Sequence, residues 1–204
     1  MKLYDSDWAP NPRRVRIFLK EKGVELPRLN IDLRSAEHKT VTFSQINPLQ
    51  RVPVLELDDG TMIAESVAIC RYIEELYPEP SLFGRTPKQK ALVEMWNRRV
   101  ELGFFAAVSA AFRHMHPGMA AAEVPQVKEW GEANKPKAMA FLAVLDREIA
   151  DRPFVAGEDF SIADITLLVA YDFMKVARLS CPQECTHVLR WYDDVSSRPS
   201  ASQS

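Results

Sequence analysis

A segment rich in proline, residues 78–88 (PEPSLFGRTPK), divides the chain into two parts with different hydrophobic periodicity. Three prolines and a glycine in eleven residues are typical of a linker. Before the segment, patterns typical of strands and of helices alternate, whereas after it every apolar pattern has helical spacing. We therefore predict an α/β domain at residues 1–77, a linker at 78–88 and an all-helical domain at 89–204.

The expected elements follow from periodicity and turn residues. In the first part we expect strands at 1–5, 28–33, 52–57 and 61–63 and helices at 12–22 and 66–77. In the second part we expect helices at 88–115, 124–150, 161–178 and 187–197. Asp59-Gly60 is a hairpin turn between the third and fourth strands. Ser161 and Asp164 are spaced as a capping box for the helix that follows them.

Composition excludes several classes of protein. Hydrophobic residues make up 47% and charged residues 26% of the 204-residue chain, as in globular proteins and unlike disordered ones. The net charge of −2 provides no basic field for nucleic acid or an anionic membrane. The apolar runs are too short to span a bilayer, and the first residues, MKLYDSDW, lack the apolar core of a signal peptide.

The cysteines point to a reducing compartment. Three cysteines cannot all pair with one another, so the cytoplasm is the simplest location. Cys181, Cys185 and His187 lie close together in the sequence, but they lack a fourth ligand and the usual spacing of a zinc site. We therefore expect no bound metal.

Val52-Pro53 stands at the start of a predicted strand. A cis bond there would direct the backbone N–H and C=O of Val52 outward, where a peptide-like ligand could pair with them. A trans proline at a first strand position is the commoner case, and from the local sequence alone it is favoured.

Glu65 and Ser66 lie at the start of the helix expected at 66–77. A helix N-terminus attracts a carboxylate, Ser66 adds a hydroxyl donor, and Glu65 could pair with an ammonium group. Together they suit the zwitterionic head of an amino acid. The structural alternative is an N-cap serine with a favourable acidic neighbour, and the local sequence favours it.

Side chains at two further positions could help to activate a thiol. Asn11 followed by Pro12 is a strong N-cap pair, and a cap at the carboxyl end of the first strand points into the ligand crevice of an α/β sheet. Ser109 and His114, on the helix at 88–115, could hold a water molecule that accepts a proton. The alternative for His114 is a cation near a helix C-terminus, and this is somewhat favoured without further information.

Taken together, these motifs resemble the cytosolic glutathione transferases. The resemblance rests on the order of the N-terminal elements, on INPLQRVPVLELDDGTMIAES at 46–66 and on FVAGEDFSIADIT at 154–166, and it runs from residue 1 to about 199. The stretches EHKT, DDGT and VKEWG make the chain most similar to a fungal and bacterial branch of this family. The family implies a thioredoxin-like N-terminal domain, an all-α C-terminal domain and a homodimer.

The resemblance also implies site residues. It implies that the Val52-Pro53 bond is cis and that Val52 binds the cysteinyl backbone of glutathione. It also implies that Glu65 and Ser66 hold the γ-glutamyl head. His38 and Lys39 match positions that reach the glycine carboxylate, and Arg51 is a second cation there. These assignments give glutathione as the cosubstrate.

The sequence departs from the family pattern where the thiol is activated. The family places Tyr, Ser or Cys at the end of the first strand, but here that slot falls at or next to Asn11, since Tyr4 and Ser6 come too early. The similar branch lacks the usual residue too, and there a water held by C-terminal-domain side chains is the proposed deprotonator. Ser109 and His114 are the candidates for holding it.

The expected function is transfer of the glutathione thiolate to a hydrophobic electrophile, as in detoxification, in a cytoplasmic homodimer. Aromatic and methionine side chains of the helical stretch at 95–116 suit such a substrate. Two alternatives remain open: a protein that binds glutathione or a hydrophobic ligand without turnover, and a transferase-like module for protein interactions.

Overall fold

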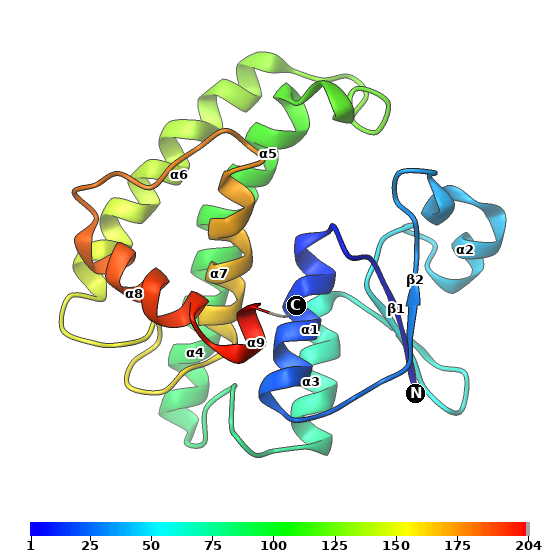
Figure 1. Ribbon diagram of the computed structural model, residues 1–204, viewed down its shortest axis with the longest axis horizontal. Helices are drawn as coiled ribbons and strands as arrows, with labels where there is room; N and C mark the ends of the chain where they lie inside the picture. The colour runs from blue at the N-terminus through cyan, green and yellow to red at the C-terminus, as the bar shows by residue number, and fades with distance from the viewer. Residues whose placement is uncertain (203–204) are drawn as a thin grey trace. The chain divides into compact units, whose positions relative to one another are not determined.

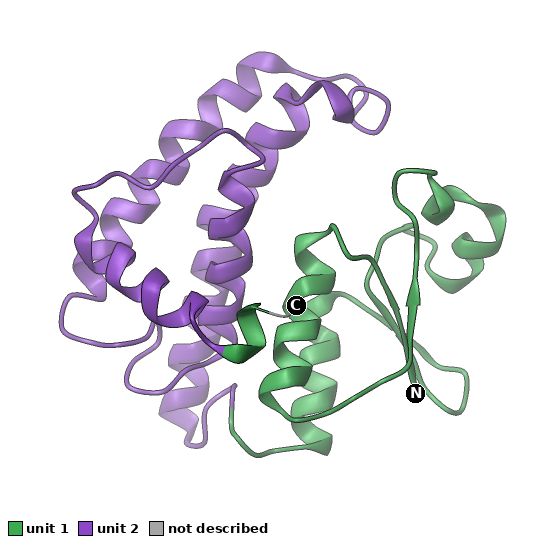
Figure 2. Cartoon of the chain, viewed as in Figure 1, with its two compact units in different colours: residues 1–81, 199–204 green, residues 82–198 purple. Residues whose placement is uncertain are grey.

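The computed structural model describes residues 1–202. They form two compact units (Figure 2): unit 1 holds Met1–Ser81 and the C-terminal segment that begins at Pro199, and unit 2 holds Leu82–Arg198. An α/β unit followed by a helical unit is the order that the sequence predicts. The sequence did not predict that the C-terminal segment from Pro199 groups with unit 1.

Unit 1 contains a four-stranded sheet in the order β2-β1-β3-β4 (Figure 1). Its strands are β1 (Lys2–Asp5), β2 (Arg28–Asn30), β3 (Val54–Glu56) and β4 (Met62–Ala64). Strand β1 pairs in parallel with β2 and antiparallel with β3, and β3 pairs antiparallel with β4. The helices of unit 1 are α1 (Pro10–Glu21), the 3₁₀ turn η1 (Glu37–Lys39), α2 (Val41–Ile46), α3 (Ser66–Leu76) and α9 (Pro199–Ser202).

Alternation along β1 places its side chains in two layers. Tyr4 is buried in a cluster with Phe43 of α2 and Val54 of β3, and the Tyr4 and Phe43 rings lie 6.3 Å apart in an edge-on arrangement. Leu3, the preceding residue, faces the other side of the sheet and is fully buried. Helices α1 and α3 pack side by side (Figure 1) and contribute the other large group of buried apolar side chains.

The first helix corrects one prediction. Helix α1 begins at Pro10 with Ala9 as its N-cap, so Asn11 lies within the first helical turn and does not cap the helix. Both Pro10 and Pro12 fit that turn, because the first N–H groups of a helix have no intrahelical partner to lose. A search for a polar N-cap misplaces the start because Ala9 caps without a side-chain hydrogen bond.

The segment between the second and third strands also differs from expectation. The sequence predicts only a connection between these two strands, whereas the structure contains η1 and α2. The short helix α2 is capped by Thr40, whose hydroxyl oxygen accepts a hydrogen bond from the Phe43 N–H at 3.2 Å. With six residues, α2 is too short for a periodicity argument to detect it.

The main elements of unit 2 are all helices or helical turns. They are α4 (Pro87–Arg99), the π-helical turn η2 (Val100–Phe105), α5 (Ala106–Met115), the 3₁₀ turn η3 (Pro117–Met119), α6 (Lys128–Glu148), α7 (Ile162–Met174) and α8 (Thr186–Ser196). The predicted helix at 88–115 is thus two helices joined by a π turn. Gly103 lies in that turn, where an added Cβ would come within 2.8 Å of the Phe141 ring of α6.

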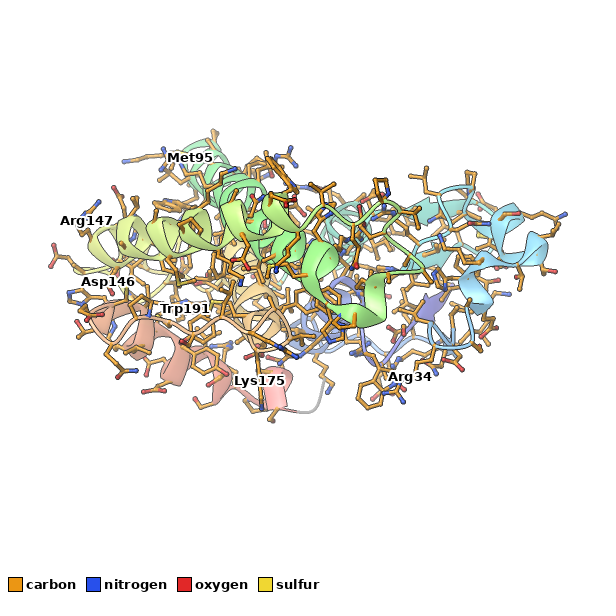
Figure 3. The ribbon with its side chains drawn as sticks, turned by 90° about the horizontal axis from the view of Figure 1, so that it is seen from above. Arg34, Met95, Asp146, Arg147, Lys175 and Trp191 are labelled. Atoms are coloured by element: carbon orange, nitrogen blue, oxygen red, sulfur yellow. The ribbon has the colours of Figure 1, made fainter. Side chains whose placement is uncertain are left out.

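Side chains cap the N-termini of several helices in unit 2, among them α7 and α8. The predicted capping box of α7 is confirmed, with Ser161 and Asp164 in their expected roles. Helix α8 is capped from another element: Asp146 of α6, labelled in Figure 3, accepts a hydrogen bond from the Val188 N–H at 2.8 Å. The spacing of a local motif could not reveal this second cap, because its acceptor lies 42 residues earlier in the chain.

The C-terminal segment binds α1 within unit 1. The Ser200 hydroxyl donates a hydrogen bond to Glu21, and Arg13 Nη2 donates one to the carbonyl oxygen of Ala201 at 3.3 Å. These contacts, at the two ends of α1, explain why the end of the chain groups with the first unit.

No helix among residues 1–202 is both long enough and apolar enough to cross a membrane. The same part of the chain contains no group of three or more His, Cys, Asp or Glu side chains arranged to hold a metal ion.

Candidate functional site

The N-terminus of α3 is the most developed polar site of unit 1. Glu65 is its N-cap, but the Glu65 side chain makes no capping hydrogen bond and is exposed. Ser66, the first helical residue, is buried with 5% of its surface accessible. The structural alternative, Ser66 as the N-cap, is therefore wrong. The free N–H groups of this helix end remain available to an anion beside the Ser66 hydroxyl.

The backbone at Glu65 is unusual for a residue with a side chain. Its φ of 67° and ψ of 113° lie outside the regions that such residues favour. A conformation of this kind costs about 1–3 kcal/mol and is found most often at ligand sites. It occurs at the N-cap of α3, directly before Ser66.

The buried side chain of Arg14 on α1 contacts this site. Its Nη1 donates a 2.8 Å hydrogen bond to Ser66 Oγ, and only 1% of its surface is accessible. Arg14 is not among the site residues predicted from the sequence. Its position offered a signal, because it lies four residues before the buried Phe18 and so shares the apolar face of the helix.

The Val52-Pro53 peptide bond is cis, which confirms what the family resemblance implies; the trans bond that the local sequence favoured is wrong. Pro53 is buried and Val52 half-buried at the start of β3. Among residues 1–202, the backbone N–H and C=O of Val52 form no hydrogen bond. A ligand with an extended backbone could therefore pair with both groups.

The loop before Val52 is tied to the 3₁₀ turn η1. The Asn47 side chain, which is buried, donates a 2.8 Å hydrogen bond to the Arg51 carbonyl oxygen. Gln50 Nε2 donates a 3.4 Å hydrogen bond to the Lys39 carbonyl oxygen. The predicted cations Lys39 and Arg51, both exposed, thus belong to two segments that contact each other. Asn47 and Gln50, which make these contacts, were not identified from the sequence.

His38 can offer an N–H donor, and its surroundings favour the neutral imidazole. Burial, together with the positive charge of Lys39, lowers the pKa of His38 below its ordinary value. Its Nδ1 is buried and has no hydrogen-bond partner among the described residues. An imidazole in this state would bind a carboxylate through an N–H group, whereas Lys39 and Arg51 would do so through charge.

The structure shows where the side chains of Tyr4, Ser6 and Asn11, at or after the end of β1, lie. The Tyr4 hydroxyl donates a 2.7 Å hydrogen bond to Glu56 of β3, and Ser6 is buried with its carbonyl oxygen bound to Arg16 at 3.0 Å. Neither side chain is presented at the surface, in agreement with the sequence argument against both. Asn11 is exposed in the first turn of α1.

The polar groups of α5 contact the loop before α6. His114 Nδ1 accepts a hydrogen bond from the Val127 N–H at 3.1 Å, and its Nε2 lies 3.6 Å from Glu123. Because Nδ1 is an acceptor, the neutral imidazole carries its proton on Nε2 and has no free lone pair. Its Nε2–H can donate a hydrogen bond to a water molecule, whereas its Nδ1 lone pair is already used by the Val127 N–H. Within residues 1–202, no hydrogen bond joins Ser109 to His114.

The fold is a thioredoxin-like unit followed by a helical unit. In the first unit, a helix N-terminus is open and a cis-proline precedes an antiparallel strand. Comparison with known proteins identifies the family. Residues 8–76 match the N-terminal domain of glutathione S-transferase, and residues 95–199 match its C-terminal domain. The chain belongs to the glutathione S-transferase family.

Individual relatives agree over the full length. The chain is 41% identical to glutathione S-transferase 2 of Saccharomyces cerevisiae, over 100% of this chain and 88% of the relative. The crystal structure of Gtt2 from the same yeast has a TM-score of 0.94 and 41% identity, covering 100% of this chain and 99% of that one. A class Gtt2 enzyme of Vibrio parahaemolyticus has a TM-score of 0.88 and 35% identity, covering 100% and 96%.

These comparisons confirm the predicted fold class, a thioredoxin-like domain followed by an all-α domain. They also confirm the predicted enzyme class, glutathione S-transferase, at the level of the family. The individual site residues remain predictions.

Proposed function

We propose that this chain binds reduced glutathione on unit 1 and transfers its thiolate to a hydrophobic electrophile. The observation that carries this proposal is the pairing of an exposed carboxylate, Glu65, with a buried hydroxyl, Ser66, at the open N-terminus of α3. That pairing is complementary to the ammonium and carboxylate groups of a γ-glutamyl residue.

The rest of the tripeptide has matching groups in the same unit. Val52 offers a backbone donor and acceptor to the cysteinyl residue. Lys39 and Arg51 offer positive charge to the glycine carboxylate, and His38 offers a neutral N–H group. The cosubstrate in this proposal is glutathione, and the reaction needs no metal.

Titration calorimetry with reduced glutathione tests the binding site. The native chain is expected to bind saturably, and the Glu65→Gln, Ser66→Ala double variant to lose most of this affinity. Glu75→Gln, an exposed carboxylate on the far turn of the same helix, is the matched control and should bind as the native chain does. Absence of binding by the folded native chain would contradict the proposal and favour a protein-interaction module.

Turnover is a separate question, because the family's usual Tyr, Ser or Cys is absent from the slot near Asn11. Conjugation of glutathione to an aromatic electrophile such as chlorodinitrobenzene should follow saturation kinetics in both substrates. Binding of glutathione without any turnover, over several classes of electrophile, would instead favour a non-catalytic binding protein.

We also propose a cytoplasmic homodimer, as the family resemblance implies. All three cysteines are buried and unpaired, as a reducing compartment requires. Sedimentation equilibrium at micromolar concentration is expected to give twice the chain mass of 23.2 kDa. A mass of one chain at every concentration would contradict the dimer.

A further inference from the structure

Among the described residues, the buried Ser66 hydroxyl has no acceptor for its own proton. The hydroxyl has one proton to donate and two lone pairs. The single hydrogen bond of Ser66 Oγ among residues 1–202 is the one it accepts from Arg14 Nη1. A guanidinium group has only donors, so the Ser66 proton cannot point toward Arg14. The proton must therefore point to the other side of the oxygen.

A donor left in this state inside a protein costs about 1–3 kcal/mol unless something accepts from it. Ser66 is the first residue of α3, so its hydroxyl lies beside the free N–H groups of the first turn. All of these groups are donors, so the site is complementary to an anionic acceptor. A carboxylate satisfies several of them at once, because its two oxygens offer about four lone-pair positions.

We propose that Arg14 is a positioning residue: by binding Ser66 Oγ from behind, it turns the Ser66 hydroxyl proton toward the α-carboxylate of the γ-glutamyl residue of glutathione. This inference rests on the proposed function and adds a residue to it. Arg14 does not touch the ligand. It acts through one oxygen, whose donor strength rises when a cation donates to it.

The geometry explains why an arginine from another helix performs this task. Arg14 and Ser66 lie on α1 and α3, which pack against each other in unit 1 (Figure 1). The side chain spans that interface under cover of the fold, since only 1% of its surface is accessible. A long, planar, permanently charged donor is suited to this position, because it cannot swing away into solvent or lose its proton.

The test varies both the protein and the ligand. The ligand pair is glutathione and γ-aminobutyryl-cysteinylglycine, which lacks only the α-carboxylate. The protein variants are Arg14→Met, Ser66→Ala and the double variant, with Arg13→Met as the matched control. Arg13 is the neighbouring arginine of α1, and it donates a hydrogen bond to the Ala201 carbonyl oxygen rather than to Ser66. Dissociation constants are measured by calorimetry for each pairing.

If Arg14 acts as proposed, Arg14→Met weakens glutathione binding about tenfold or more, as expected for a lost hydrogen bond to a charged group. It changes binding of the analogue by less than about twofold. In the Ser66→Ala background, Arg14→Met then has little further effect. Arg13→Met leaves the ratio of the two dissociation constants as it is in the native chain.

Three results would overturn the inference. One is an equal loss for both ligands, which would make Arg14 a merely structural residue. Another is an undiminished Arg14→Met effect in the Ser66→Ala background. The third is a native chain that does not prefer glutathione over the analogue. If the native chain binds neither ligand, the proposed function fails as well, so the two failures can be told apart.

Folding of the variants is checked by circular dichroism. If Arg14→Met does not fold, Arg14→Lys replaces it and is judged by the same ratio, because lysine keeps the charge but not the planar fork. If neither variant folds, Ser66→Ala decides: unchanged preference for glutathione over the analogue in that variant overturns the inference.

Discussion

Trp191 Nε1 donates a 2.9 Å hydrogen bond to Asp164 Oδ1 in the interior of unit 2. Both side chains are fully buried, and Trp191 is labelled in Figure 3. The same carboxylate accepts hydrogen bonds from the Val155 N–H at 2.8 Å and from the Ser161 N–H and hydroxyl at 3.0 Å. Burial raises the pKa of Asp164, and these donors oppose that shift. Asp164 thus joins the start of α7, the loop before it and α8.

Asp164→Ala should therefore destabilise unit 2 by about 3 kcal/mol or more, since it removes a helix cap and leaves several buried donors without an acceptor. Asp159→Ala, an exposed carboxylate in the same loop, should change stability by less than about 0.5 kcal/mol. Urea unfolding followed by circular dichroism measures both. Equal effects of the two substitutions would contradict this role of Asp164.

A second prediction concerns the carboxylates at the end of β1. Asp5 is fully buried, lies 2.7 Å from Arg16 Nη1 and also binds Arg28, whereas the exposed Asp7 carboxylate pairs with Arg28 at 2.7 Å. Asp5→Ala should cost about 3–5 kcal/mol, because it leaves the buried Arg16 charge without its carboxylate. Asp7→Ala should cost about 0–1 kcal/mol. Denaturant unfolding of the two variants tests the contrast, which similar losses would refute.

The third prediction concerns the pH dependence of stability. Burial raises the pKa of the Cys70 thiol to about 12, compared with about 8.5 for a free cysteine. Between these values the folded chain keeps a proton that the unfolded chain releases, so stability falls as pH rises. The contribution of Cys70 is complete below about pH 8.5 and is lost toward pH 12, with a slope of at most about 1.4 kcal/mol per pH unit.

Replacing Cys70 by alanine should remove this part of the alkaline slope, although other groups keep theirs. The measurement is the free energy of unfolding at several pH values from 7 to 11 for both chains. Cys185→Ala serves as a comparison, since that thiol is also buried but belongs to unit 2. If the native chain and Cys70→Ala lose stability in parallel above pH 8.5, the prediction is wrong.

The fourth prediction concerns thiol activation. If Asn11, Ser109 or His114 stabilises the glutathione thiolate, its substitution by alanine should raise the pKa of the bound thiol toward the free value. It should also lower kcat/KM at pH 7 by about tenfold or more. The pH dependence of kcat/KM measures both effects. For His114 the structure allows only a donor role through Nε2, so His114→Gln should retain more activity than His114→Ala.

Ser197→Ala, an exposed serine of unit 2, is the control for these substitutions and should keep the native pH profile. If none of the three variants changes the profile, the proposed activation is wrong, and backbone groups at the start of α1 become the remaining candidates.

The sequence by itself determined the class of fold. Alternating and helical periodicities, separated by the segment at 78–88, give an α/β unit followed by helices, because each pattern buries its apolar side chains in only one kind of element. The capping box of Ser161 and Asp164 was predictable for the same reason: both partners lie within one turn of a single helix. Glu65 and Ser66 could be proposed as ligand groups because they lie at a helix N-terminus that the local sequence reveals.

Tertiary structure decided what depends on residues distant in the chain. Arg14 contacts Ser66 across 52 positions, and Asp146 caps α8 across 42, so no local pattern reveals either contact. The start of α1 at Pro10 escaped prediction because Ala9 caps it without a side-chain bond. A sequence states which groups are available, but the direction in which the Ser66 hydroxyl points is fixed only when packing brings Arg14 behind it.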